Sequence, residues 1–367
     1  MRCNRSSRSS PARSCCCIKR RAAAMADTYA AFIAKLDEIS PAIAKAFREA
    51  VEDITSATQL RVLQAAIERG DVEGAVAAIN LGSAFFAPLD QAVVDSFRSG
   101  AVWQLAQTLP KSGSLAGRLQ IRFDGRHQRA ETWTRRQGAR LVTEVAESVK
   151  EAVRLTVRNG LQDGRNPRAV ALDIVGRTNR ATGRREGGIL GLTSQQAGYV
   201  ANARREIEEL DGSYFQRKLR DKRFDGTVSK AIKDGKPLSK ADVDRITARY
   251  SDRLLKHRGD VIGRTEALTA LNAGRHEGMQ QLAEDPAIPR AAVKREWIST
   301  PDSRTRDSHA TMSRQKVGLD EPFVTPEGHR MRYPGDRELG APASETISCR
   351  CSFRARVDFG MVAELAE

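Results

Sequence analysis

Apolar residues spaced three and four positions apart recur along most of the chain before residue 283, and this spacing predicts helices. One stripe lies near the start of the sequence, and a longer one runs over residues 128–159. A helix that buries one face produces this pattern. The stripes consist of Phe32, Leu36, Ile39, Ile43 and Phe47, and of Leu141, Val145, Val149 and Val153.

Capping residues predict where several helices begin and end. Thr28 is a plausible N-cap of the first helix, and Asn166 followed by Pro167 is typical of a helix start. Thr193 and Gln196 form a capping-box pattern. Gly160 and Gly164 are expected to end the long helix over residues 128–159.

Two more helices are expected between Ser239 and Ala283. The first should begin at the Ser239 to Asp242 cap and run to about Arg258. The second should cover Val261 to Ala283. A loose connection is predicted over residues 107–125, which contain several prolines and glycines.

The helical spacing of apolar residues does not continue after Trp297. Proline and glycine are frequent over residues 297–353, where they oppose regular helix. We therefore predict short strands and ordered turns, and a fold with mainly α-helical N-terminal and middle regions and a small α+β C-terminal module. The breaking residues include Pro322, Pro326, Gly328, Pro334, Gly335, Gly340 and Pro342.

The predicted organisation has five parts. Residues 1–24 are a mis-called start or a disordered basic leader, 25–125 a helical N-terminal domain, 126–260 a helical middle region with a basic tract, 261–356 the C-terminal module, and 357–367 a tail. The leader contains four of the six cysteines and no acidic residue, and we expect Met25 to be the true start.

Composition narrows the class of protein. The chain has 367 residues, 5% aromatic residues and a net charge of +15. This charge is consistent with an anionic partner or with a solvated basic surface. No apolar run approaches the roughly 20 residues that cross a bilayer, so we expect a soluble protein without a membrane partner. Beyond the leader, two cysteines provide no disulfide framework, which suits a reducing cytosol.

A dense basic tract follows residue 216. Its members could neutralise phosphates without reading bases, so we consider non-specific binding of double-stranded DNA. A solvated helix face is the alternative. The first residues of the tract are Arg217, Lys218, Arg220, Lys222 and Arg223, and further lysines continue to Lys240.

His309, Cys349 and Cys351 have the side chains that zinc prefers. Residues two apart on an extended strand face one side, so both thiolates could reach one ion. His329 or Asp307 could complete the ligand set. The alternative is two reduced cysteines in a small core.

Asp302, Arg304, Asp307 and His309 have the residue types of an acid–base site, and Cys349 with His309 could form a nucleophilic pair. Their spacing defines no nucleophile, so a nuclease or toxin-like enzyme is the alternative rather than the preferred interpretation. In the preceding helix, a buried Glu266 would need a cationic partner. Arg304 or Arg306 could provide it.

The segment Arg264-Thr265-Glu266, then Trp297, the run from Asp302 to His309, and the terminal Cys349-Arg350-Cys351 follow one another in this order. Together they resemble the phage Mu F-like family of head-morphogenesis proteins over about Val261 to Phe353. Two positions depart from the family pattern: Ser348 stands where Asn is expected, and Ser313-Arg314 where a Gly is usual. The residues that carry the resemblance are Arg264, Thr265, Glu266, Asn272, Gly274, Trp297, Asp302, Arg304, Arg306, His309, Phe323, Gly328, Tyr333, Gly335, Cys349 and Cys351.

The resemblance implies a non-catalytic minor head protein of a tailed phage. The implied partners are the portal protein, capsid or scaffold proteins, and packaged double-stranded DNA. The implied location is the procapsid or virion, and the cytoplasm of the infected bacterium during assembly.

Overall fold

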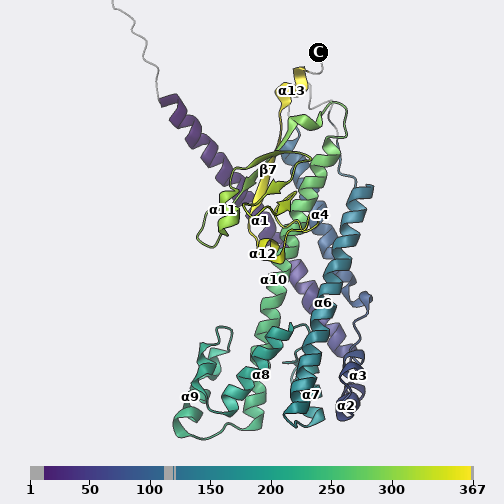
Figure 1. Ribbon diagram of the computed structural model, residues 1–367, viewed down its shortest axis with the longest axis vertical. Coiled ribbons are helices and arrows are strands. Elements are labelled where there is room, and N and C mark those ends of the chain that lie inside the picture. The colour runs from purple at the N-terminus through teal and green to yellow at the C-terminus, as the bar shows by residue number, and fades with distance from the viewer. Residues whose placement is uncertain (1–11, 111–118, 120, 365–367) are drawn as a thin grey trace, which may run out of the picture. The chain divides into compact units, whose positions relative to one another are not determined.

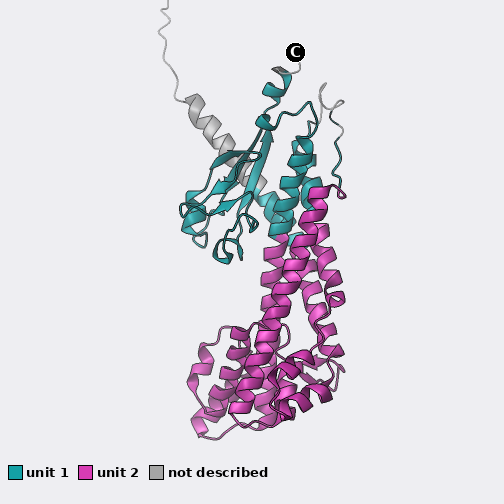
Figure 2. Cartoon of the chain, turned by 45° about the vertical axis from the view of Figure 1, so that its right-hand side comes forward, with its two compact units in different colours: residues 1–39, 97–124, 268–367 teal, residues 40–96, 125–267 magenta. Residues whose placement is uncertain are grey.

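The computed structural model describes residues 12–110, 119 and 121–364, with side chains from Tyr29 onward (Figure 1). It is mainly helical, with small antiparallel sheets near the C-terminus, so the predicted fold class is confirmed. No helix in these residues is long and apolar enough to cross a membrane. Contacts divide the chain into two compact units, which are coloured teal (unit 1) and magenta (unit 2) in Figure 2.

Unit 2 comprises residues 40–96 and 125–267 and is built from helices around α6. The predicted stripe on α6 is buried, from Leu141 to Val153. The helices α2, α3, α7 and α8 pack around this core. The elements are α2 (Leu60–Glu68), α3 (Val72–Ala77), η1 (Ser83–Phe86), α6 (Gln128–Gln162), α7 (Pro167–Val175), α8 (Ser194–Glu208), η2 (Gly212–Gln216), η3 (Lys222–Phe224), α9 (Asp225–Asp234) and the hairpin β1 (Arg177–Thr178) to β2 (Arg185–Glu186).

The capping predictions for unit 2 hold with one exception. Asn166 accepts hydrogen bonds from the backbone of α7, and Thr193 with Gln196 forms the expected capping box. Gly160 was expected to end α6 but lies inside it, where a Cβ would come within 2.5 Å of Val170 Cγ2. Its role is close packing against α7, and Gly164, with a positive φ, follows the helix end.

Three long helices contribute residues to both units: α1 (Ala12–Ala57), α4 (Ala87–Thr108) and α10 (Lys240–Leu282). Because α1 begins at Ala12, Thr28 is not its N-cap. The break expected near Arg258 is also wrong, since α10 is continuous. Gly263 does not interrupt this helix, and it lets α10 approach the backbone of Ser40 and Ala44.

Unit 1 contains residues 97–124 and 268–367 and the first part of α1. Its sheet has the order β4–β3–β7 with antiparallel neighbours, and β3 pairs Trp297 with Phe353 of β7. A second small sheet joins β5 to β6. The elements are η4 (Arg290–Ala292), β3 (Val293–Ile298), α11 (Asp307–Thr311), β4 (Lys316–Gly318), β5 (Phe323–Val324), β6 (Arg330–Met331), α12 (Ala343–Thr346), β7 (Ser352–Val357) and α13 (Phe359–Glu364).

The turn after β6 is joined to the C-terminal part of α10 by side-chain hydrogen bonds to backbone carbonyls. Asn272 Nδ2 donates to the carbonyl of Pro334 at 3.1 Å, and Thr269 Oγ1 donates to that of Gly335 at 3.5 Å. Gly335 has a φ of 93°, and a Cβ there would meet Thr269 Oγ1 at 2.7 Å. The turn predicted at this proline and glycine is therefore an anchoring point for the module.

Candidate functional site

Three side chains with metal-ligating atoms meet beside the central strand of unit 1. His309 lies on α11, while Cys349 and Cys351 lie in the turn between α12 and β7. All three are buried, and the His309 ring contacts the Trp297 ring edge to face, with the ring centres 5.2 Å apart. Because β3 and β7 are paired at Trp297 and Phe353, the cysteines are held next to α11.

The geometry of the three donors is nearly symmetric. His309 Nδ1 is 3.6 Å from Cys349 Sγ and 3.6 Å from Cys351 Sγ. The three ligand atoms all lie within 4.8 Å of one another. Both cysteines are reduced. The structure thus brings together the three residues that the sequence suggested for zinc.

Each of the two thiols shifts the pKa of the other. The hydrogen bond between them, together with burial, raises the pKa of Cys349 well above its usual value. The same bond and the neighbouring His309 ring lower the pKa of Cys351 to about 5. In addition, the backbone N–H of Cys351 donates to Cys349 Sγ at 3.4 Å. A negative charge can therefore reside on this pair inside the protein core.

Glu345 of α12 connects the three donors to a second histidine. Its Oε2 is 2.9 Å from His309 Nε2, although the two groups are not aligned as a hydrogen bond. Its Oε1 is 3.5 Å from His329 Nδ1. His329, expected as a fourth ligand, therefore groups with Glu327 and Glu345 instead. The other candidate, Asp307, is exposed.

The loop before α11 is fixed by Asp302 and Arg350. The guanidinium of Arg350 donates to both Asp302 oxygens at 2.5 and 2.6 Å, and this holds the pKa of Asp302 well below its usual range. The Tyr29 hydroxyl donates to Thr300 Oγ1 at 2.9 Å. Asp302 therefore acts as a partner of Arg350, which differs from the acid–base role considered from the sequence.

The arginines of the same loop have structural contacts. Arg304 is exposed, and its Nη2 lies 3.6 Å from Asp302 Oδ2. Arg306 Nη2 donates to the carbonyl of Ile347 at 2.5 Å, close to the cysteine turn. Neither arginine is the partner of Glu266.

Arg264, Thr265 and Glu266 lie in the part of α10 that belongs to unit 2. Glu266 is buried, accepts a hydrogen bond from Gln137 Nε2 at 2.5 Å and lies 3.4 Å from Arg140 Nη2. Burial raises the pKa of Glu266. The predicted need for a cationic partner was correct, but the partner comes from α6, which the sequence did not single out.

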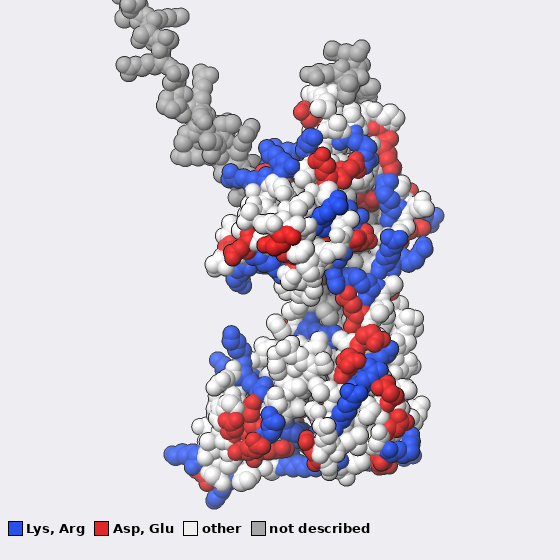
Figure 3. Space-filling view, in the orientation of Figure 1, with Lys and Arg blue, Asp and Glu red and all other residues white. Residues whose placement is uncertain are grey.

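The basic tract contains more internal ion pairs than its sequence suggests. Arg217 pairs with Glu206 and Arg220 with Asp225 at 2.5 and 2.9 Å, while Arg223 pairs with the buried Asp221 at 2.6 Å. The lysines of the tract, including Lys218 and Lys222, are exposed. On the face drawn in Figure 3, basic and acidic side chains are interspersed.

Two buried arginines were not predicted from the sequence. Arg275 is 2% exposed and donates to Gln104, Asn272, Ser352 and the carbonyl of Phe353. Arg295 is fully buried and donates to the carbonyls of residues 318, 321 and 332. Burial lowers the pKa of Arg275 to about 9 and that of Arg295 to about 10. Their spacing alone would not have revealed these roles.

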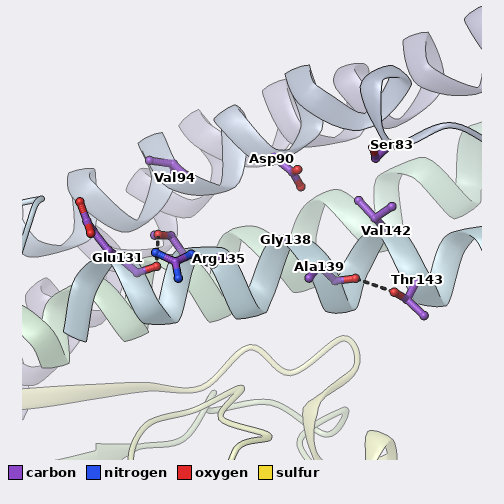
Figure 4. Close-up of a pocket in the computed structure, with 10 residues that line it drawn as sticks. Ser83, Asp90, Val94, Glu131, Arg135, Gly138, Ala139, Val142 and Thr143 are labelled. Atoms are coloured by element: carbon purple, nitrogen blue, oxygen red, sulfur yellow. Dashed lines mark hydrogen bonds between the residues drawn. The ribbon is translucent and has the colours of Figure 1, made fainter. Parts of the chain in front are cut away.

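Unit 2 has an open pocket of about 700 Å³ between α4 and α6 (Figure 4). Asp90 of α4 contributes a buried Oδ1 without a hydrogen-bond partner, and burial raises the pKa of this carboxyl. Gly138 of α6 leaves space for it, since a Cβ there would lie 2.8 Å from Asp90 Oδ1. The other lining residues are Ser83, Val94, Glu131, Thr134, Arg135, Ala139, Val142 and Thr143.

Comparison with known proteins gives two findings. Residues 222–354 match the family model described as Phage Mu protein F like protein, which confirms the resemblance on that segment. The chain is also similar to NAD(+)–arginine ADP-ribosyltransferase EFV of Enterococcus faecalis, with 35% identity over 97 residues. That alignment covers 26% of this chain and 18% of the relative. No solved structure matches the chain significantly.

Proposed function

We propose, from the Phage Mu protein F like match over residues 222–354, that this chain is a minor head protein of a tailed phage. The family match supports a role in phage head morphogenesis. The finer proposal is a non-catalytic component of the procapsid or virion that contacts the portal and packaged DNA. The match is the observation that carries this proposal, since it extends from η3 through α10 to β7.

The architecture suits an assembly factor. Unit 1 holds buried arginines and paired strands that fix a compact module, and the matching segment includes residues 268–354 of it. Unit 2 is a helical body with charged side chains on its surface (Figure 3).

The assembly role is tested by locating the protein in particles. Procapsids and mature virions would be purified from the phage or prophage that encodes this chain, and their proteins identified by mass spectrometry. We expect the chain in procapsids, and co-purification with the portal protein when the two are expressed together. Absence from both particle types, with no portal binding, would contradict the proposal.

Weak, sequence-independent binding of duplex DNA is proposed for the exposed lysines of the basic tract. The arginines are poor test positions because each already pairs with a carboxylate: Arg217 with Glu206 of α8, Arg220 with Asp225 of α9, and Arg223 with Asp221 at the start of η3. The test variant replaces four exposed lysines with Ala, and its control removes the same charge elsewhere. The test positions are Lys218, Lys222, Lys230 and Lys233, and the control positions are Lys45, Lys256, Lys294 and Lys316.

A gel-shift series at several salt concentrations measures the effect. Each phosphate contact that is lost should reduce the slope of log affinity against log salt by about 0.9. We expect a shallower slope and weaker binding for the test variant than for the control. Equal binding by the two variants would show that the tract is only a solvated face.

The partial similarity to an ADP-ribosyltransferase favours one check of the non-catalytic proposal. The name describes an activity of that protein, of which the alignment covers 18%. The full chain would be incubated with NAD⁺ and an arginine-containing acceptor, and ADP-ribosylated product sought by mass spectrometry. We expect no product above a heat-treated sample, whereas enzyme-dependent modification would establish an activity.

A further inference from the structure

We propose that His309, Cys349 and Cys351 bind one zinc ion, through His309 Nδ1 and the two sulfur atoms, as a structural centre of unit 1. This inference concerns the stability of the C-terminal module and does not depend on the proposed assembly role. It rests on the distances among three buried donors and on the carboxylate behind the imidazole.

The distances match those of a tetrahedral zinc site. With Zn–S near 2.3 Å and Zn–N near 2.0–2.1 Å, a nitrogen and a sulfur on one tetrahedral ion stand about 3.6 Å apart. The two observed separations between Nδ1 and Sγ are both 3.6 Å. A hydrogen bond from one thiol to the ring would be expected to bring one sulfur closer than the other. Equal separations are better explained by a shared ion.

The donor types and their surroundings favour zinc. Thiolate and imidazole are the protein ligands that zinc prefers, whereas hard cations such as Mg²⁺ prefer oxygen. The thiolate charge is supported by the N–H of Cys351, which donates to Cys349 Sγ. Among the described residues, the cluster has three protein donors, so a fourth position is left for a small ligand such as water.

Glu345 is placed to orient the histidine. In zinc sites, the ring nitrogen that does not bind the metal usually faces a carboxylate, which fixes the tautomer and the ring orientation. Glu345 Oε2 lies 2.9 Å from His309 Nε2, on the side of the ring away from the sulfurs. We assign Glu345 a positioning role, since its oxygens are not among the three clustered donors.

The ion would stabilise a segment made of short elements. Between His309 and Cys349 the helices and strands have two to four residues once α11 has ended. An ion that joins these two positions closes a long loop, and closing such a loop reduces the entropy of the unfolded chain. Zinc would therefore connect α11 to the turn that leads into β7.

Zinc content is measured on the full chain with Cys3, Cys15, Cys16 and Cys17 replaced by Ser, so that the leader thiols cannot bind metal. Purified without added metal or chelator, this protein should contain about one zinc per chain. The double variant Cys349→Ser and Cys351→Ser should lose the zinc. The variant His257→Ala removes an exposed histidine of α10 and should retain it.

A spectroscopic test keeps the proposal falsifiable where the double variant does not fold. The protein with the four leader cysteines replaced by Ser would be stripped of metal and titrated with cobalt. We expect the strong visible bands of a tetrahedral cobalt ion and a near-ultraviolet sulfur-to-cobalt charge-transfer band. Zinc at less than about a tenth per chain, together with only the pale spectrum of six-coordinate cobalt, would overturn the proposal.

The positioning role of Glu345 has its own readout. Replacing such a carboxylate weakens metal affinity about 10–100-fold. We expect this loss for Glu345→Gln in competition with a chelator, and no loss for Glu327→Gln, which alters an exposed carboxylate of the neighbouring group. Equal zinc affinities of the two variants would show that Glu345 does not position His309.

Discussion

The side chain of Arg275 contacts Phe353 in two ways at once. Its guanidinium carbon lies 4.4 Å from the centre of the Phe353 ring, and its Nη2 donates to the carbonyl of the same residue at 2.5 Å. Arg275 is on α10 and Phe353 on β7, so one side chain joins the long helix to the sheet of unit 1. The rings of Phe32 and Trp103 also face this cation, at 5.4 and 5.0 Å.

Replacing Arg275 with Lys should destabilise unit 1. A lysine has one nitrogen and cannot reach all the acceptors that the planar guanidinium satisfies. Leaving buried acceptors unpaired costs about 1–3 kcal/mol each, so we expect the free energy of unfolding to fall by about 2–4 kcal/mol. Chemical denaturation measures the change.

The control for this prediction is Arg205→Lys. Arg205 is exposed on α8, and its guanidinium donates a hydrogen bond to Asn202 of the same helix. A surface change of this kind should alter stability by less than about 0.5 kcal/mol. Similar effects of the two substitutions would show that the buried guanidinium has no special role.

Much of the fold could be predicted because it depends on local pattern. The stripe on α6 and the caps at Asn166 and Thr193 specify helices through side chains close in sequence. The two cysteines and His309 could be grouped because their side chains have a shared chemistry. The partner of Glu266 could not be predicted, since Gln137 and Arg140 lie on another helix.

The different roles of Gly160 and Gly164 could not be predicted from the sequence either. Gly164 follows a helix end, whereas Gly160, four residues earlier, is a packing position inside the helix. Both are glycines in the same polar context, and the difference arises from Val170 on the neighbouring helix. Contacts with residues distant in the sequence decide whether a glycine ends a helix or packs inside it, and such contacts cannot be inferred from one sequence.

Gly274→Ala should destabilise the packing of α4 on α10. A Cβ at this position would collide with the carbonyl oxygen of Phe97 and lie 3.1 Å from the nitrogen of Ala101. Backbone atoms cannot rotate away, so the helices must separate, and overpacking of this kind costs about 1–3 kcal/mol. Thermal unfolding monitored by circular dichroism measures the loss.

The matched control is Gly226→Ala on α9. A Cβ there meets no atom within 4 Å. Alanine is the better helix former, so this change should stabilise the protein by up to about 1 kcal/mol. Opposite signs for the two substitutions are expected, and a stabilising effect of Gly274→Ala would contradict the close approach of the helices.

Glu266→Gln should change how stability depends on pH. Burial raises the folded-state pKa of Glu266, so the folded protein binds more protons than the unfolded chain above the ordinary carboxyl pKa of 4.5. Stability of the wild type therefore falls as pH rises from 4.5 through the raised pKa. Glutamine keeps a side-chain acceptor for Gln137 and carries no charge.

The stability of Glu266→Gln relative to wild type should increase between pH 5 and pH 7, as measured by urea denaturation at both values. Glu144→Gln is the control, because Glu144 also pairs with Arg140 but is exposed. If the wild type instead became more stable relative to Glu266→Gln as pH rises, the contact with Arg140 would outweigh the cost of burying the carboxylate.

Ser348→Asn and Arg314→Gly should each stabilise unit 1. Both residues lie where the sequence was expected to depart from the family pattern, and both have left-handed backbone, with φ of 56° and 69°. Side chains other than Gly, Asn and Asp resist this conformation at a cost of roughly 1–2 kcal/mol. Asn tolerates it well, and Gly adopts it freely.

We expect each change to raise the free energy of unfolding by about 0.5–1 kcal/mol, since the relief of strain is partly offset for Gly by the greater freedom of the unfolded chain. The same substitutions on regular helices serve as controls: Ser229→Asn on α9 and Arg205→Gly on α8 should both lower stability, the latter by about 1 kcal/mol.

If Ser348→Asn and Arg314→Gly destabilise like their controls, the side chains of Ser348 and Arg314 contribute more than their backbone strain costs. A gain at Ser348 would further indicate that the turn before Cys349 is held in place by its neighbours, because a strained residue persists only where the surrounding contacts fix its conformation.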